Sequence, residues 1–297
     1  MTDYLKRYGY TPDIEEINRS LAIISESRDS FISEEVLKEC FSMMDLTSLK
    51  TQDTEKSITR LVEKVNTFRD SYPTYPNPAS ICVFSNFAGT VKAAKTADDV
   101  HVTVVSACFP SSQSFIEVKL KECEMAVRQG ADEVDIVLAL NAFLAGDFER
   151  ASEEIRLVRS TIDAVAAEQN RSVTLKVILE TGLLVTPENI ANASFLAMES
   201  GADFIKTSTG KVDVNATPMA AYVMCECIAA YYRVTGQKIG FKPAGGMSTA
   251  ADAASYYAIV AAVLGKEWLN RSLFRFGVSR MANNLLSEIE QETISFF

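Results

Sequence analysis

The chain has 297 residues, of which 47% are hydrophobic and 23% charged, so it can bury the core of one large domain. Its net charge of -10 argues against nucleic acid or an anionic membrane as the main partner, although a phosphorylated ligand would still need a local cationic site. The six cysteines form no CxxC pair and His101 is the single histidine, which argues against a structural zinc site, a disulfide framework and Ser-His-Asp catalysis. The longest aliphatic run, residues 258–264, is too short to span a bilayer, and the first seven residues lack the apolar core of a signal peptide. We therefore expect a cytoplasmic protein.

Residues 1–42 are expected to form a helical extension that is separate from the rest of the chain. Thr11-Pro12-Asp13 predicts a helix start with proline at the first helical position, and apolar residues then recur at helical spacing. Ser33 predicts the cap of a second helix that runs through Phe41. We interpret this extension as a lid or a packing arm.

From residue 43 onward, strand-like segments alternate with helical patterns. Strands are expected at residues 43–47, 80–84, 102–106, 133–138, 174–179, 204–207, 238–244 and 273–276. Regular alternation of this kind predicts a parallel sheet, and eight units close most naturally into an α/β fold of the (β/α)₈ barrel type. The chain has no flexible linker, so residues 43–297 are expected to form a single barrel.

Charged residues interrupt five of these apolar strands. They are Asp45, Asp135, Lys176, Glu180, Lys206 and Lys242. Burying a charge without a partner is costly, and the active site of a βα barrel lies at the C-terminal ends of its strands. Two explanations are open, namely a structural ion-pair network and a catalytic centre.

Lys206 is the most informative of these residues, because it lies in the middle of the strand within Gly201–Lys211. One explanation is that its amine reaches out to water, and the other is that it is buried, neutral and nucleophilic. Lys242 could supply the neighbouring cation that lowers its pKa, and Asp135 could move protons. Gly-Ala-Asp precedes both the Asp135 strand and the Lys206 strand, so these two residues are expected to face a common lumen at similar height.

Three glycine-containing segments predict a phosphate site. They are Thr209-Gly210-Lys211, Gly245-Gly246 before a capped helix, and Gly277-Val278-Ser279-Arg280 before the last helix. Glycines at helix N-termini leave N–H donors free, and barrels commonly hold phosphate in the loops after strands 7 and 8.

At these residues the chain resembles the deoxyribose-phosphate aldolases, a family of class I aldolases that act through a Schiff base. The matching motifs are Met-Asp-Leu-Thr at 44–47, Ala-Asp-Glu-Val-Asp at 131–135, Leu-Lys-Val-Ile-Leu-Glu-Thr-Gly at 175–182, Phe-Ile-Lys-Thr-Ser-Thr-Gly-Lys at 204–211, Asn-Ala-Thr-Pro at 215–218, Gly-Phe-Lys-Pro-Ala-Gly-Gly at 240–246 and Arg-Phe-Gly at 275–277. They run in order across residues 43–285, and the two lysine motifs together are highly specific.

The resemblance implies a TIM barrel that reversibly cleaves 2-deoxy-D-ribose 5-phosphate to D-glyceraldehyde 3-phosphate and acetaldehyde, a lyase reaction of deoxyribonucleotide and carbohydrate catabolism. It implies that Lys206 forms the Schiff base, that Lys242 perturbs its pKa, that Asp135 relays protons and that Lys176 supports them. The phosphate would be held by Gly210, Lys211, Gly245, Gly246, Gly277 and Ser279. The resemblance implies neither a metal nor an organic cofactor, and the partners are small sugar phosphates and aldehydes. The oligomeric state stays open, a homodimer being one option.

This chain departs from the family pattern around the phosphate and at both ends. Ser248 stands where relatives often have arginine, and Arg280 where they often have serine, so we expect Arg280 to supply the cation near the phosphate. The first 42 residues extend beyond the short bacterial form, and the chain ends in Ile-Ser-Phe-Phe rather than in tyrosine. Two other functions stay open from the residues alone, a phosphosugar isomerase and a barrel that binds a sugar phosphate as a sensor.

Overall fold

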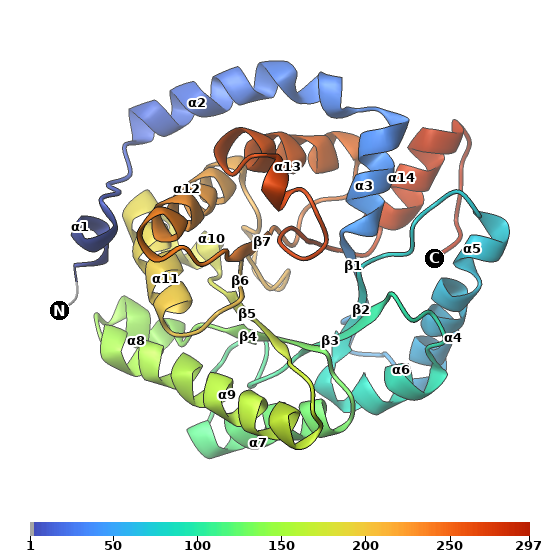
Figure 1. Cartoon of the computed structure of the whole chain (residues 1–297), viewed down its shortest axis with the longest axis horizontal. Coiled ribbons are helices and arrows are strands. Elements are labelled where there is room, and N and C mark those ends of the chain that lie inside the picture. Colours follow the sequence, from blue (N-terminus) through green and yellow to red (C-terminus); the bar gives the residue numbers. More distant parts are fainter. Residues whose placement is uncertain (1–2) are drawn as a thin grey trace.

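Eight parallel strands form the barrel of the computed structural model, which describes residues 3–297 (Figure 1). The strands are β1 (Met44–Thr47), β2 (Ser80–Phe84), β3 (His101–Val105), β4 (Glu133–Val137), β5 (Thr174–Ile178), β6 (Phe204–Lys206), β7 (Gly240–Lys242) and β8 (Phe276–Val278). Each pairs with its neighbour in the order β7-β6-β5-β4-β3-β2-β1-β8. The parallel bridges Phe241–Phe274 and Ala244–Gly277 join the two end strands. The predicted TIM barrel is therefore confirmed.

Helices surround the barrel and connect successive strands (Figure 1). The longer ones are α4 (Glu55–Asn66), α6 (Ala88–Ala94), α7 (Ile116–Arg128), α9 (Phe148–Glu168), α11 (Pro187–Glu199), α12 (Pro218–Thr235), α13 (Ala250–Val263) and α14 (Met281–Glu290). Shorter turns of helix are α5 (Phe68–Ser71), α8 (Leu140–Leu144), α10 (Thr181–Leu184), η1 (Arg28–Phe31), η2 (Ser85–Phe87) and η3 (Lys266–Trp268). Thr186 and Thr217 cap α11 and α12, each ahead of a proline. Within residues 3–297, no helix combines the length and the apolar character needed to cross a bilayer.

From residue 3 onward, three α-helices precede β1, namely α1 (Tyr4–Tyr8), α2 (Ile14–Ser27) and α3 (Glu34–Ser42), and the short η1 lies between α2 and α3. In Figure 1, α2 runs along the outside of the molecule beside α12 and α13, which it contacts. The Tyr8 ring stacks on Phe195 of α11 at 4.5 Å, and its hydroxyl donates to Glu199. These contacts are with the outer face of the helical layer, which is how a packing arm would lie. The prediction that Pro12 opens α2 is wrong, because Asp13 is the N-cap and its carboxylate accepts the first free N–H groups.

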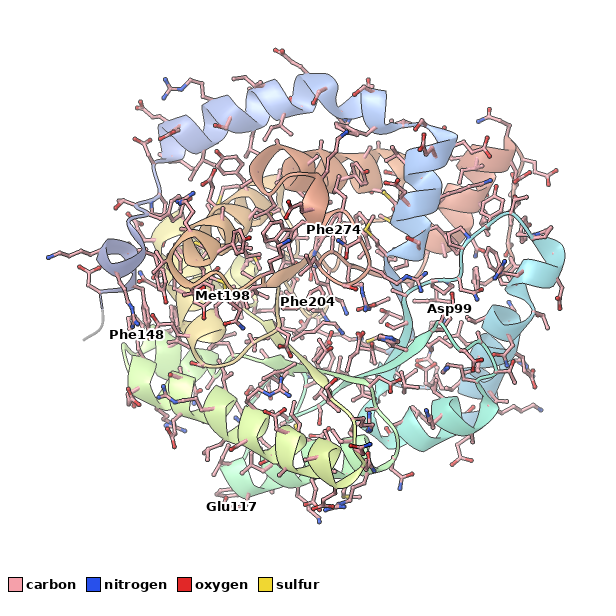
Figure 2. All side chains as sticks on the ribbon, in the orientation of Figure 1. Asp99, Glu117, Phe148, Met198, Phe204 and Phe274 are labelled. Atoms are coloured by element: carbon pink, nitrogen blue, oxygen red, sulfur yellow. The ribbon has the colours of Figure 1, made fainter. Side chains whose placement is uncertain are left out.

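The last strand begins later than the sequence predicts. Residues 273–276 have the higher strand propensity, but pairing with β1 starts only where Phe276 meets Met44. Phe274 makes a single bridge to Phe241, and its buried ring lies with that of Phe204 among the side chains inside the ring of helices (Figure 2). Arg275 therefore precedes β8 rather than lying within it. The residue is only 3% exposed.

Candidate active site

A network of charged side chains fills the lumen of the barrel. Its members are Asp45 on β1, Glu133 and Asp135 on β4, Lys176 on β5, Lys206 on β6, Lys242 on β7 and Arg275 just before β8. Alternate residues of a strand share a face, which is why Glu133 and Asp135 both point inward. All seven residues are at most 4% exposed. Each carboxylate is paired with cations, as buried charges require.

Asp135 lies at the centre of this network and accepts hydrogen bonds from three lysines. Its Oδ1 binds the Lys176 amine at 2.9 Å, and its Oδ2 binds Lys206 at 2.9 Å and Lys242 at 2.8 Å. Asp135 and Lys206 thus face one lumen, as predicted. In register, Asp135 pairs with Lys176 and Lys176 with Phe204. The strands of a (β/α)₈ barrel are tilted and staggered by about one residue per strand, so Lys206, two strands from Asp135 and two residues beyond Phe204, lies at a similar height, as expected.

The second group of contacts is centred on the carboxylates of Glu133 and Asp45. Arg275 donates to both carboxylate oxygens of Glu133, at 2.7 and 3.1 Å, and also to Asp45. Lys176 binds Glu133, and Lys242 binds Asp45. Most of the lumen charges therefore do form the ion-pair network that was one of the two explanations. Lys206 differs, since among the residues that the structure describes it has only Asp135 as an ionic partner.

The environment separates the three lysines into two kinds. Burial lowers the pKa of Lys206, and the neighbouring Lys242 cation lowers it further, while Asp135 opposes both effects. Burial alone would also lower the pKa of Lys242, but Asp135 and Asp45 raise it above its ordinary value. Asp135 and Glu133 raise the pKa of Lys176 in the same way, against burial. Lys176 and Lys242 are therefore held as cations, whereas the surroundings of Lys206 shift its equilibrium toward the neutral amine.

Asp135 remains a carboxylate in this setting. Burial alone would raise its pKa, but the three lysines hold that pKa well below its ordinary value. An ionised oxygen within hydrogen-bond reach of the Lys206 amine can accept a proton from it and return it.

Lys206 opens onto a cavity of about 330 Å³ at the C-terminal ends of the strands. The predicted phosphate residues all line this cavity: Gly210, Lys211, Gly245, Gly246, Gly277, Ser279 and Arg280. Lys242, Asp135 and Lys176 do not line it and lie fully buried behind Lys206. The cavity is therefore lined by the Lys206 amine and by groups that suit an anion. Within residues 3–297, no three His, Cys, Asp or Glu side chains are grouped so that they could hold a metal ion.

The loops around this cavity depend on glycine and on one buried acid. Gly245 has φ 79°, and a Cβ there would lie 2.7 Å from Oδ1 of Asn215. Glu180 is buried and accepts hydrogen bonds from the N–H and the hydroxyl of Thr209, which fixes the loop that carries Gly210. No side chain caps the N-terminus of α14, so its first N–H groups are available to an anion beside Arg280.

The family model described as "DeoC/LacD family aldolase" matches residues 40–279. The chain belongs to this family. It is 39% identical to the deoxyribose-phosphate aldolase of Homo sapiens over 266 residues, covering 86% of this chain and 80% of that one. It is 35% identical to a candidate deoxyribose-phosphate aldolase of Caenorhabditis elegans, covering 95% and 90%. A crystal structure of a candidate deoxyribose-phosphate aldolase from Toxoplasma gondii shares the fold, with a TM-score of 0.73, 23% identity and coverage of 87% and 95%. The protein is thus an aldolase, a carbon–carbon lyase.

Sequence reasoning missed some residues of this DeoC/LacD aldolase site. Glu133 was recognised only as part of a motif, although its spacing of two residues from Asp135 puts both on one face of the strand. The sequence predicts that Arg275 lies in the last strand and indicates no ion-pair partner for it. Residues 47–50, which come at the end of β1 and just after it, also line the cavity, and the carbonyl of Leu49 accepts a hydrogen bond of 2.7 Å from the Lys211 amine. No local pattern indicated that contact, since 162 residues separate the two partners.

Proposed function

We propose that this aldolase cleaves 2-deoxy-D-ribose 5-phosphate reversibly to D-glyceraldehyde 3-phosphate and acetaldehyde, through an imine on Lys206. The observation that carries the proposal is one cavity that joins the Lys206 amine to all three predicted phosphate segments. Asp135 and Lys242 lie directly behind that amine. Two relatives, which are 35% and 39% identical to this chain, are named for this activity, and these names support the choice of substrate.

The reaction begins when the neutral Lys206 amine attacks the C1 aldehyde of the open-chain sugar. The alkoxide that forms takes up a proton from solvent, and Asp135 then transfers a proton from the amine to the resulting hydroxyl, so that water leaves and an iminium forms. Lys176 holds the second oxygen of Asp135 and keeps the carboxylate oriented. Lys242 remains charged beside the amine and favours its neutral form before attack.

Carbon–carbon cleavage then uses the iminium as the electron acceptor. Asp135 takes the proton of the C3 hydroxyl, the C2–C3 bond breaks, and the electron pair of that bond moves toward the iminium to give an enamine and D-glyceraldehyde 3-phosphate. A proton then adds to the enamine carbon, and water hydrolyses the resulting iminium to acetaldehyde and free Lys206. Gly210, Lys211, Gly245 and Gly246, with Gly277, Ser279 and Arg280, would hold the phosphate during these steps.

Borohydride reduction in the presence of acetaldehyde tests the proposal. Reduction should leave an ethyl group on Lys206, and trypsin should then fail to cleave after this residue. Mass mapping should therefore show a single modified peptide of residues 177–211 in place of residues 177–206 and 207–211. The Lys206→Met variant should acquire no adduct at any other lysine of the lumen.

An ethyl group on Lys176 or Lys242 would overturn the assignment of Lys206. A phosphosugar isomerase or a sugar-phosphate sensor would give no adduct at all, so the same experiment separates the three functions.

We also propose a cytoplasmic location, since all six cysteines are free, as is usual in a reducing compartment.

A further inference from the structure

Inside the barrel, the numbers of positive and negative side chains are equal when the Lys206 amine is neutral. Three carboxylates (Asp45, Glu133 and Asp135) face three cations that remain charged (Lys176, Lys242 and Arg275). Each of these six groups forms ion pairs with at least two groups of opposite sign. A proton on Lys206 would add a fourth cation to a closed set of three pairs.

We propose that Arg275 and Glu133 set this charge balance and thereby keep Lys206 unprotonated, although neither residue lines the cavity. The proposal rests on the proposed function, because it concerns the amine that forms the imine. Arg275 and Glu133 act through other residues, so they are positioning residues rather than catalytic ones.

A continuous chain of hydrogen bonds connects Arg275 to the reactive amine. Arg275 binds Glu133, Glu133 binds Lys176, Lys176 binds Asp135, and Asp135 binds Lys206. All five side chains are buried, so water screens their interactions only weakly. A change of one unit charge at either end therefore changes the field at the other.

Other charged or titratable groups also face the two ends of this series of hydrogen bonds. Lys206 faces Asp135, Lys242 and the buried thiol of Cys82 on β2, and Lys50, Lys211 and Arg280 line the cavity onto which it opens. Arg275 faces the carboxylates of Asp45 and Glu133, and it lies 5.8 Å from the centre of the Phe204 ring. Glu133 also contacts His101, whose side chain is 51% exposed at the start of β3, at 2.7 Å. Glu180 belongs to a different group of contacts, because its carboxylate binds Thr209.

Two substitutions remove charges of opposite sign and should shift the acidic limb of the pH–rate profile in opposite directions. Arg275→Met leaves three carboxylates with two fixed cations, so Lys206 should hold its proton more tightly. The acidic limb of the pH–rate profile should then move to higher pH by about one unit, the size expected for a buried charge that is separated from the amine by three side chains. Glu133→Gln leaves three fixed cations with two carboxylates and should move the same limb downward by a similar amount.

The double variant Arg275→Met/Glu133→Gln restores equal numbers of each charge, so its acidic limb should return toward that of the unmodified protein. Arg275→Lys keeps the charge and should leave the limb in place. The readouts are kcat/KM for 2-deoxy-D-ribose 5-phosphate between pH 5 and 10, and the pH dependence of borohydride trapping by acetaldehyde. Thermal unfolding of each variant shows whether it is folded.

Opposed shifts that cancel in the double variant would support the proposal. Shifts in the same direction, or none in either single variant, would overturn it. If Arg275→Met does not fold, Glu133→Gln decides alone, since an unmoved limb in that variant is incompatible with the charge balance. The proposed function is tested independently of the variants, because it is refuted if borohydride and acetaldehyde leave no adduct on Lys206 of the unmodified protein. Trapping at Lys206 with unmoved limbs in the variants would refute only the role of Arg275 and Glu133.

Discussion

Replacing Lys242 by methionine should protonate Lys206 without altering the lining of the cavity. Methionine is apolar and similar in length, and Lys242 is fully buried behind Lys206. The substitution therefore removes one charge with little change in volume. Lys242 is held charged by Asp135 and Asp45, and the loss of its field should raise the pKa of Lys206.

The size of this shift can be worked out from the position of the two amines. Both bind Oδ2 of Asp135, Lys206 at 2.9 Å and Lys242 at 2.8 Å, so they are neighbours across a single oxygen atom. Two unit charges about 5 Å apart at an effective dielectric constant of about 20 repel by about 3 kcal/mol. Since one pKa unit corresponds to about 1.4 kcal/mol, the pKa of Lys206 should rise by about two units.

The assay is the pH dependence of kcat/KM for 2-deoxy-D-ribose 5-phosphate. Only the neutral amine attacks, so the rate falls as the pH drops below the pKa of Lys206, and a higher pKa moves this limb upward. At pH 7 the Lys242→Met variant should be about 100-fold slower, and it should recover part of that loss as the pH rises. Lys242→Arg, which keeps the charge, is the matched control and should leave the limb where it is. A loss of rate that is equal at every pH would refute the electrostatic role of Lys242.

Two further substitutions test other parts of the site. Asp135→Asn should reduce kcat at least about 100-fold, the usual range for a proton-transfer group, while KM changes little; full turnover would place the proton relay elsewhere. Arg280→Ser should raise KM for the phosphorylated sugar about tenfold, as expected for a lost charge-assisted hydrogen bond, and should leave unphosphorylated 2-deoxyribose unaffected. Equal effects of Arg280→Ser on both substrates, or none on either, would show that this side chain does not contact the phosphate.

The sequence predicted the barrel because its signals are local. Alternation of apolar strands with capped helices depends on residues that are neighbours in the chain, such as Thr186 with Pro187 and Thr217 with Pro218. Strand β2 was predicted at its observed bounds for the same reason. β8 was misplaced because its extent is decided by pairing with β1, more than 200 residues earlier, rather than by its own propensity.

The identity of the charged residues was also visible in the sequence, since a lysine or an aspartate inside an apolar strand is conspicuous in any chain. Their partners were not visible. Arg275 reaches Glu133 over 142 positions of sequence and Asp45 over 230, and such pairs exist only once the barrel has closed.

Tertiary structure alone decided how the surroundings of the three lumen lysines differ. Lys176, Lys206 and Lys242 are all buried lysines on strands, and all three bind Asp135. Glu133 and Asp45 give Lys176 and Lys242 further carboxylates, whereas Lys206 has Asp135 alone and opens onto the cavity. A residue type sets the ordinary pKa of an amine, but the direction in which that pKa moves depends on the charges and the solvent within a few ångströms, and these are brought together only by the fold.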